Sequence, residues 1–383
     1  MPEHDFVHTR LTHSLEVSSV GRSLGKRAGE VIIERHPDLV ANFSSFDIGA
    51  ITAAAALAHD MGNPPFGHAG ETAISNYFIE HKGIEVTKDE LADLQHFEGN
   101  AQGFRLINRK DYGLKLTYAT LGAFTKYPCH SAFDRRDPKR KSQKKFGYFQ
   151  TEKDAFADVA DKLGLIKFED GVWCRHPLAF LVEAADDICY SIIDLEDACR
   201  LGIVTLDETV DLLAPILGHK LNKQKLMEAR GLNSRLGALR AMTIGELIDA
   251  CTEVFVDNEK GILDASFDRA LTDICKFKAP LNDIAKLSVD KIYRTLSVVE
   301  IEAAGHEILP ALVADFIKAG ENVVSGNRKY QNMSLLFPED IRLAIKEHHD
   351  KKYLLIRDVL DFISGLTDRH ALSLYRKIKG ISF

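Results

Sequence analysis

Most apolar residues of this sequence recur at intervals of three and four, and few stretches alternate with a period of two. The first spacing places apolar side chains on one face of a helix, whereas the second is typical of a strand. The stretches that fit the helical spacing are residues 11–20, 48–57, 74–78, 104–107, 180–195, 209–217, 244–256, 292–316 and 354–363. The best strand candidate is a hairpin over residues 165–173 that turns at Glu169, Asp170 and Gly171. The sequence therefore predicts an all-α fold with at most one short hairpin.

The composition of the 383 residues is that of a globular protein, with 45% hydrophobic and 27% charged residues. It excludes a disordered chain, a collagen-like fibre and a disulfide-stapled miniprotein. The net charge of −7, from 49 basic and 56 acidic residues, argues against a general nucleic-acid coat protein. The six cysteines form no CxxC pair and the opening segment MPEHDFVHTR has no apolar run behind it, so we expect reduced thiols and a cytoplasmic protein. The apolar stretch 48–58 is too short to cross a membrane.

The most basic stretch is residues 134–146, DRRDPKRKSQKKF, which carries seven Lys or Arg side chains against two aspartates. Such a run of charge is compatible with a solvated, mobile loop. It is also compatible with a flap that attracts anions near a phosphate site. The sequence alone leaves both interpretations open.

Three groups of residues could contribute ligands to one metal ion: His13, the adjacent pair His59 and Asp60, and the acidic residues within 183–187. Imidazole and carboxylate together suit Mn²⁺, Fe²⁺ or Co²⁺, and Mg²⁺ less well. Two adjacent residues do not fill a coordination sphere, so the pair needs a second His and a second carboxylate, with positions left for water and a substrate oxygen. His13 and Asp186 are suitable partners, although spacing does not choose Asp186 over Asp187. Taken alone, a His-Asp dipeptide is more often a core-facing His beside an exposed Asp.

The loop that follows His59 and Asp60 contains four helix breakers: Gly62, Pro64, Pro65 and Gly67. It therefore turns directly after the pair. His68 and Glu71 come next, three residues apart, and share one face if a helix begins at 67–70. A carboxylate beside a His can hold it protonated near neutral pH, which suits a general acid. The alternative is a helix cap or a surface ion pair.

Asp186, Tyr190 and Asp194 follow one another at intervals of four, so on a helix they form a stripe about 12 Å long. Such a line could contact a nucleotide, with phosphate at the metal, sugar and base beside the ring, and a hydroxyl at the second acid. The simpler alternative has Tyr190 in the core and Asp194 exposed. Lys126, in TKYP, ends a helical run and provides either a compact charge for a phosphate oxygen or an ordinary contact with the helix dipole.

Several motifs occur in the order typical of one known family: RLTHSLE, AHDMGNPPFGHAGE, FEGNAQGFR, TKYP, KKFGYF, AADDICYSIIDLEDA and GLTDRHALSLYRKI. Over about residues 9–379 the chain resembles the dNTP triphosphohydrolases, the deoxyguanosine-triphosphate triphosphohydrolase group of the HD-domain superfamily. This resemblance implies an all-α HD-domain helical bundle with additional C-terminal helices. Residues 1–200 would form the metal and catalytic core. Residues 201–383 would form a helical C-terminal part packed with it as one continuous body.

The resemblance also implies a role for individual residues. The metal ligands implied are His13, His59, Asp60 and Asp186. The catalytic pair is His68 with Glu71, and the substrate-binding residues are Asn100, Gln102, Lys126, Tyr127, Tyr190 and Asp194. Among these, Tyr190 is expected to stack on the substrate, Asp194 to recognise the 3′-hydroxyl, and Lys126 with Tyr127 to meet the triphosphate. The C-terminal triphosphate contacts cannot be placed one by one, and Arg357, Arg369 and Arg376 are candidates.

The reaction that the resemblance implies is hydrolysis of a dNTP to a deoxynucleoside and inorganic triphosphate. It would use one divalent ion, Mn²⁺, Mg²⁺, Fe²⁺ or Co²⁺, with His68 as proton donor or as activator of water. Twelve residues precede His13, fewer than in the family, so the base preference stays open between dGTP and a broader range. We also expect a homo-oligomer, and a nucleotide or single-stranded DNA as activator. Two other functions stay open: an HD phosphohydrolase acting as a nucleotidase or phosphodiesterase, and a nucleotide- or DNA-sensing regulator.

Overall fold

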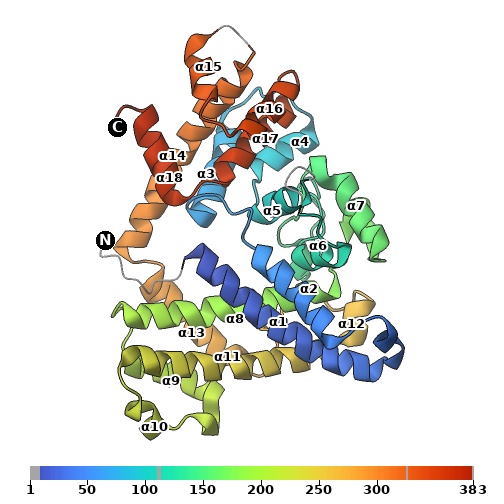
Figure 1. Cartoon of the computed structure of the whole chain (residues 1–383), viewed down its shortest axis with the longest axis vertical. Helices are drawn as coiled ribbons and strands as arrows, with labels where there is room; N and C mark the ends of the chain where they lie inside the picture. Colours follow the sequence, from blue (N-terminus) through green and yellow to red (C-terminus); the bar gives the residue numbers. More distant parts are fainter. Residues whose placement is uncertain (1–8, 110–113, 325–326, 382–383) are drawn as a thin grey trace.

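The computed structural model describes residues 9–109, 114–324 and 327–381. These residues form helices joined by loops, with one two-stranded antiparallel sheet of β1 (Lys167–Glu169) and β2 (Val172–Trp173) (Figure 1). The predicted all-α class and the single hairpin are thereby confirmed. The expectation of a cytoplasmic protein rested partly on the opening segment, of which residues 1–8 lie outside the described residues.

Four long helices form the frame of the molecule: α1 (Arg10–Arg35), α8 (Pro177–Arg200), α11 (Leu232–Asp257) and α14 (Leu296–Glu321). The shorter helices are α2 (Ser45–Ala58), α3 (Gly67–Glu80), α4 (Lys88–Gln95), α5 (Gly99–Asn108), α6 (Tyr118–Phe124), α7 (Lys153–Lys162), α9 (Leu206–Leu217), α10 (Lys223–Glu228), α12 (Glu259–Leu263), α13 (Lys278–Leu287), α15 (Arg328–Ser334), α16 (Glu339–Glu347), α17 (Lys352–Ser364) and α18 (Asp368–Ile378). Short turns of 3₁₀ or π helix are η1 (Pro37–Ala41), η3 (Lys141–Gln143), η4 (Gln150–Glu152), η5 (Gly218–Lys220) and η6 (Ser288–Ile292). Each predicted helical stretch falls on a helix, although the stretch 292–316 begins within η6.

Helices α1 and α2 pack with their backbones unusually close, because glycines line the contact. A Cβ atom at Gly25 would lie 2.9 Å from the Cα atom of Gly49, a distance that real side chains do not tolerate. A Cβ atom at Gly29 would lie 3.1 Å from the Cα atom of Ser45. Small residues at these positions therefore let the two helices lie against each other over their length. This packing fixes where the first turns of α1 stand relative to the end of α2.

Two hydrophobic clusters stabilise the fold. The first runs from Val17 on α1 to Ile284 on α13, and it surrounds α8. The second runs from Ala73 on α3 to Leu374 on α18, and it surrounds α14 and α17. In Figure 1, α14 extends from the region of α8 and α13 to the region of α3 and α17. Both clusters draw on residues from either side of position 200, and the division of the chain at that position stays a prediction. Within the described ranges, no helix combines the length and the apolar character needed to cross a membrane.

Candidate functional site

The start of α1, the end of α2 and the middle of α8 bring together the residues predicted to bind a metal. His13 stands in the first turns of α1, His59 caps the end of α2 with Asp60 directly after it, and Asp186 lies on α8. One ligand atom each from His13, His59 and Asp60 lie within 4.8 Å of one another. Oδ1 of Asp186 lies 3.4 Å from Nε2 of both imidazoles. The rings of the two histidines meet edge to face, with centroids 5.3 Å apart.

The orientation of His59 is set by the backbone of α2. Its Nδ1 lies 2.7 Å from the carbonyl oxygen of Ala56, so this nitrogen carries a proton and donates it. The other ring nitrogen, Nε2, is buried, has no hydrogen-bond partner among the described residues, and faces the carboxylates of Asp60 and Asp186. An imidazole nitrogen that faces two carboxylates is favourable only when a cation, either a proton or a metal ion, lies between them. The donor set is therefore one that a divalent cation fits.

Asp186, rather than its neighbour, joins this group. Burial favours the protonated form of Asp186, but Lys126 and the two imidazoles outweigh it and hold the pKa of this carboxyl well below its usual range. Asp187 points elsewhere and accepts a 2.6 Å hydrogen bond from the hydroxyl of Thr272. Burial raises the pKa of Asp187 to about 7. The geometry thus distinguishes two adjacent acids that the sequence could not.

The predicted catalytic pair is formed at the start of α3. Nδ1 of His68 lies 2.8 Å from Oε2 of Glu71, and the His68 side chain is 84% exposed. The hydrogen bond to Glu71 raises the pKa of His68 above its ordinary value, because it favours the imidazolium over the neutral ring. Glu71 is buried, and its other oxygen accepts a 2.7 Å hydrogen bond from the backbone N–H of Gly99. An exposed imidazolium held by a buried carboxylate is suited to proton donation.

A short chain of contacts connects the metal ligands to this pair. The side-chain amide of Asn63 donates a 2.7 Å hydrogen bond to Oδ1 of Asp60. Asn63 also lies against Gly99, where a Cβ atom would be 2.2 Å from the Asn63 Oδ1 atom and 2.7 Å from Oε1 of Glu71. Glycine is therefore required at position 99 by the lack of space for a Cβ atom. Arg10 fixes the same loop by donating to the carbonyl oxygen of Asn63 at 2.8 Å.

Two lysines approach the site from different directions. Lys126, in the loop after α6, donates a 2.7 Å hydrogen bond to Oδ2 of Asp186. Lys145, at the end of the basic stretch 134–146, lies 3.7 Å from Oε2 of Glu71 and 3.0 Å from Oε2 of Glu98. Burial acts to lower the pKa of Lys145, but these carboxylates raise it, so its ammonium stays charged. The neighbour of Lys126, Tyr127, is buried beneath the guanidinium of Arg175.

The predicted stripe on α8 is present, and a further aromatic ring covers it. Tyr190 is half exposed, and the ring of Tyr293 stacks on it with centroids 5.7 Å apart and planes inclined by 23°. The Tyr293 hydroxyl donates a 2.7 Å hydrogen bond to Oδ2 of Asp194. Tyr293 thus contacts the ring expected to stack on a substrate and the acid expected to bind its hydroxyl.

Asn100 and Gln102 both lie on α5, but only one of them is near the surface. Asn100 is half buried and donates a 2.6 Å hydrogen bond to Glu98. Gln102 is fully buried, donates a 2.7 Å hydrogen bond to Asp361, and accepts one from Arg357. The structure therefore brings Gln102 together with α17 and not with the metal group. Of the C-terminal arginines considered as triphosphate contacts, Arg357 is fully buried in the same network.

Sequence reasoning missed four side chains of this region: Asn63, Glu98, Lys145 and Tyr293. Asn63 and Glu98 lie within the motifs GNPPFGHAGE and FEGNAQ, which also contain residues predicted to belong to the site. Their place in these motifs was therefore a signal that could have identified them. Lys145 was one of seven cations in the basic stretch, and nothing in that run marks the one that reaches the site. Tyr293 is separated from Asp194 by 99 positions, and its sequence context, DKIYRTL, gives no indication of the contact.

Comparison with known proteins adds to this geometry. Residues 10–122 match the HD domain family, and residues 276–377 match the phosphohydrolase-associated domain family. The first of these matches contains His13, His59, Asp60, His68 and Glu71. HD domains bind divalent metals, which agrees with the donor set described above.

Two relatives are named deoxyguanosinetriphosphate triphosphohydrolase-like protein. The one from Synechocystis sp. is 41% identical over 392 residues, which cover 98% of this chain and 87% of the relative. The one from Pseudomonas aeruginosa is 36% identical over 396 residues, with 99% and 87% covered. The deoxyguanosinetriphosphate triphosphohydrolase of Yersinia enterocolitica is 28% identical over 451 residues, with 97% and 87% covered. This chain therefore belongs to the family of deoxyguanosinetriphosphate triphosphohydrolase-like proteins, which are hydrolases built on an HD domain.

Proposed function

We propose that this protein hydrolyses deoxynucleoside triphosphates, dGTP or a broader range, to a deoxynucleoside and inorganic triphosphate. The observation that carries the proposal is the convergence of His13, His59, Asp60 and Asp186 around one position, with the orphaned Nε2 of His59 directed into it. The names of the relatives support the substrate class. A divalent cation held by these four side chains would supply Lewis acidity to a phosphate oxygen of the substrate.

Two lysines of the chain would offset further negative charge on the phosphates of the substrate. Lys126 is held beside Asp186 by a 2.7 Å hydrogen bond, and burial acts to lower its pKa while Asp186 raises it. Its ammonium is therefore charged and already oriented toward the position where the α-phosphate would lie. Lys145 brings a second charge near Glu71, on the side of the catalytic pair. Preoriented cations of this kind stabilise negative charge that develops in the transition state.

His68 would supply the proton that the departing 5′-oxygen takes up, and the attacking water would release a proton to solvent in balance. A water oxygen forms a bond to the α-phosphorus while the bond from that phosphorus to the 5′-oxygen breaks. The 5′-oxygen is a poor leaving group as an alkoxide, so it needs a proton as it departs. The exposed imidazolium of His68, held by Glu71, is the donor that we assign. Its alternative role is to accept a proton from the attacking water.

The sugar would lie along α8, beyond the phosphates. Asp194 would accept the 3′-hydroxyl, and the stacked rings of Tyr190 and Tyr293 would close the space around the sugar. Two large rings packed close to C2′ leave little room for a 2′-hydroxyl, which supports deoxynucleotides as substrates. The preferred base, the activating nucleotide or single-stranded DNA, the homo-oligomer and the cytoplasmic location stay predictions.

The test is incubation of the full chain with each dNTP and Mn²⁺ or Mg²⁺, with products separated by anion exchange. We expect deoxynucleoside and inorganic triphosphate. In ¹⁸O-labelled water the label should enter the triphosphate and not the nucleoside, because water attacks phosphorus. Orthophosphate as the product would instead support a nucleotidase or phosphodiesterase. Salt-sensitive DNA binding without turnover of any dNTP would support a regulator.

A further inference from the structure

A basic cavity lies outside the catalytic site. It has a volume of about 560 Å³ and is formed by the basic stretch 134–146 together with residues 268–273. Its walls carry six cationic side chains, from Arg136, Lys139, Arg140, Lys141, Lys144 and Arg269, against three carboxylates, from Asp137, Asp268 and Asp273. The lining therefore has a surplus of three positive charges.

The basic stretch is anchored rather than free, so this cavity has a defined shape. The Arg136 guanidinium donates to the carbonyl oxygens of Phe133 and Gln143 at 3.0 and 3.1 Å. The backbone N–H of Ser142 donates to Oδ1 of Asp268 at 3.0 Å, and Arg140 lies over the ring of Phe168. Together these contacts hold the loop against the segment that follows α12.

The three carboxylates in the wall are already engaged, whereas three of the cations are not. Asp268 accepts from Ser142, Asp273 pairs with Lys141 at 3.2 Å, and Asp137 accepts from the backbone N–H of Lys139 at 2.9 Å. In the part of the chain that the structure describes, the charged groups of Lys139, Lys144 and Arg269 are exposed and have no partner. Three unpaired cations around one cavity favour a ligand with several negative charges.

The lining also indicates which polyanion fits. None of the side chains that line the cavity is aromatic, so the site offers no aromatic ring on which a base could stack. Proteins that bind single-stranded nucleic acid usually combine cations with such rings. Lysine and arginine bind phosphate oxygens by charge and hydrogen bonding, and this contact needs no base. The cavity therefore suits a short chain of linked phosphates better than a nucleic acid strand.

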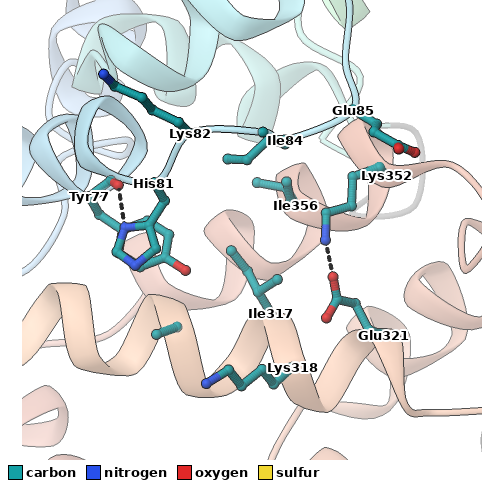
Figure 2. A pocket seen from close by; sticks show the side chains of 12 residues that line it. Tyr77, His81, Lys82, Ile84, Glu85, Ile317, Lys318, Glu321, Lys352 and Ile356 are labelled. Carbon is teal, nitrogen blue, oxygen red and sulfur yellow. Dashed lines mark hydrogen bonds and ion pairs between the residues drawn. The ribbon is translucent and has the colours of Figure 1, made fainter.

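Another cavity of the molecule differs from the basic cavity in the charge of its lining. It has a volume of about 400 Å³ and lies between α3, α14 and α17, at the end of α3 remote from His68 (Figure 2). Three lysines and two glutamates line it, and Figure 2 shows Lys352 bonded to Glu321 across one side. Its walls include the aliphatic side chains of Ile84, Ile317 and Ile356. That cavity has a surplus of one positive charge, against three in the basic cavity.

We propose that the basic cavity binds a linear oligophosphate, and that it receives the inorganic triphosphate released at the catalytic site. The second part rests on the proposed function. The supporting observation is continuity along the chain, because Lys144 lines the cavity and the next residue, Lys145, lies 3.7 Å from Oε2 of Glu71. A product that leaves the catalytic pair along this loop meets a second set of cations at its end. Occupation of the cavity would slow release of the next product, so triphosphate would inhibit turnover through it.

The experiment measures binding of inorganic tripolyphosphate to the full chain by equilibrium dialysis in EDTA, without turnover. Lys139→Ala/Lys144→Ala removes two exposed, unpaired cations, and we expect it to weaken binding roughly tenfold. Lys88→Ala/Lys162→Ala removes the same charge from exposed positions on α4 and α7, and we expect a change of less than about twofold. With dNTP as substrate, only the first variant should lose inhibition by added tripolyphosphate, while its initial rates stay at the wild-type level.

Equal affinity of the two double variants, or no binding by the wild type, would overturn the proposed cavity site. Tighter binding of a short single-stranded oligonucleotide than of tripolyphosphate, lost in the first variant, would also overturn it in favour of a nucleic acid site. Binding through Lys139 and Lys144 in a protein that releases no triphosphate from any dNTP would support the cavity. That last result would refute the proposed function, and with it the receipt of released triphosphate, but not the oligophosphate site, so the failures are distinguishable.

Discussion

Lys126 donates a 2.7 Å hydrogen bond to Oδ2 of Asp186, across 60 positions of sequence. The bond leaves Oδ1 of Asp186 facing the imidazoles of His13 and His59, so it orients the carboxylate for a metal. It also places an ammonium directly beside the metal group. We infer that substrate phosphate would draw Lys126 from Asp186 to a phosphate oxygen, and that the arriving negative charge would be matched by a cation already in position.

Replacing Asp186 with Ala should remove most of the bound metal and most of the activity. It deletes the acid that lies 3.4 Å from both imidazoles, and loss of a direct ligand should cost more than the roughly hundredfold lost with an outer partner. Mn²⁺ binding by titration calorimetry measures it. Asp187→Asn is the matched control, since Asp187 is bonded to Thr272 and should leave metal affinity unchanged. Full metal occupancy in Asp186→Ala would transfer the assignment to Asp187.

Replacing His68 with Ala should leave metal and nucleotide binding intact and lower kcat by about 100- to 10,000-fold. The reason is that His68 contacts Glu71 and solvent, and takes no part in the metal group. Steady-state kinetics and a metal titration on the same preparation provide the two readouts. His81→Ala, at the other end of α3, should have wild-type kcat. Unchanged turnover in His68→Ala would remove this residue from the mechanism.

Much of the fold could be predicted from the sequence, because local signals decide helices. Residues 48–57 are alanine-rich and 180–195 are periodic, and both are helical in the structure. Residue type made His13 a suitable partner for His59, but the family resemblance was needed to single it out, because spacing does not say which helix ends meet. That meeting depends on the close packing of α1 and α2 at Gly25 and Gly49.

The remainder of the site depends on contacts between distant segments. Tyr293 reaches Asp194 because η6 turns the chain directly before it, and no periodicity reports such a turn. Gln102 was expected near the substrate, together with Asn100, because the family resemblance implies it. On a helix, however, a step of two residues turns a side chain to the opposite face, and Gln102 points into the core.

The fall of kcat on the alkaline side of the pH–rate profile should follow deprotonation of His68. Its pKa is raised by the hydrogen bond to Glu71, so the imidazolium persists above the pH at which a free His loses its proton. A general acid acts in its protonated form, and kcat should therefore fall as the pH rises through this elevated pKa. Glu71→Gln removes the anion and should move the fall to lower pH. Glu80→Gln, an exposed acid on the same helix, should not move it. A profile that is the same in all three proteins would contradict the assignment of His68 as the acid.

Replacing Tyr293 with Ala should weaken deoxynucleotide binding and relax the rejection of ribonucleotides. The change removes the ring stacked on Tyr190 and the hydroxyl bonded to Asp194, which corresponds to an increase in KM of about three- to tenfold. The ratio of kcat/KM for a dNTP and the matching NTP measures the second effect. Tyr293→Phe keeps the ring, so it should retain the discrimination. A ratio that Tyr293→Ala leaves unchanged would show that this ring does not line the sugar site.

Replacing Gln102 with Ala should destabilise the protein rather than weaken substrate binding. The side chain is fully buried against helix α17, where it donates to Asp361 at 2.7 Å and accepts from Arg357. Arg357 is also fully buried, and its Nε and Nη1 atoms have no hydrogen-bond partner within the described residues. Loss of Gln102 would leave a buried guanidinium without this acceptor, which should cost about 1–3 kcal/mol of unfolding free energy. Urea unfolding measures it, and Asn76→Ala, an exposed amide on α3, should change stability by less than about 0.5 kcal/mol. A variant of wild-type stability with a raised KM would instead place Gln102 against the nucleotide.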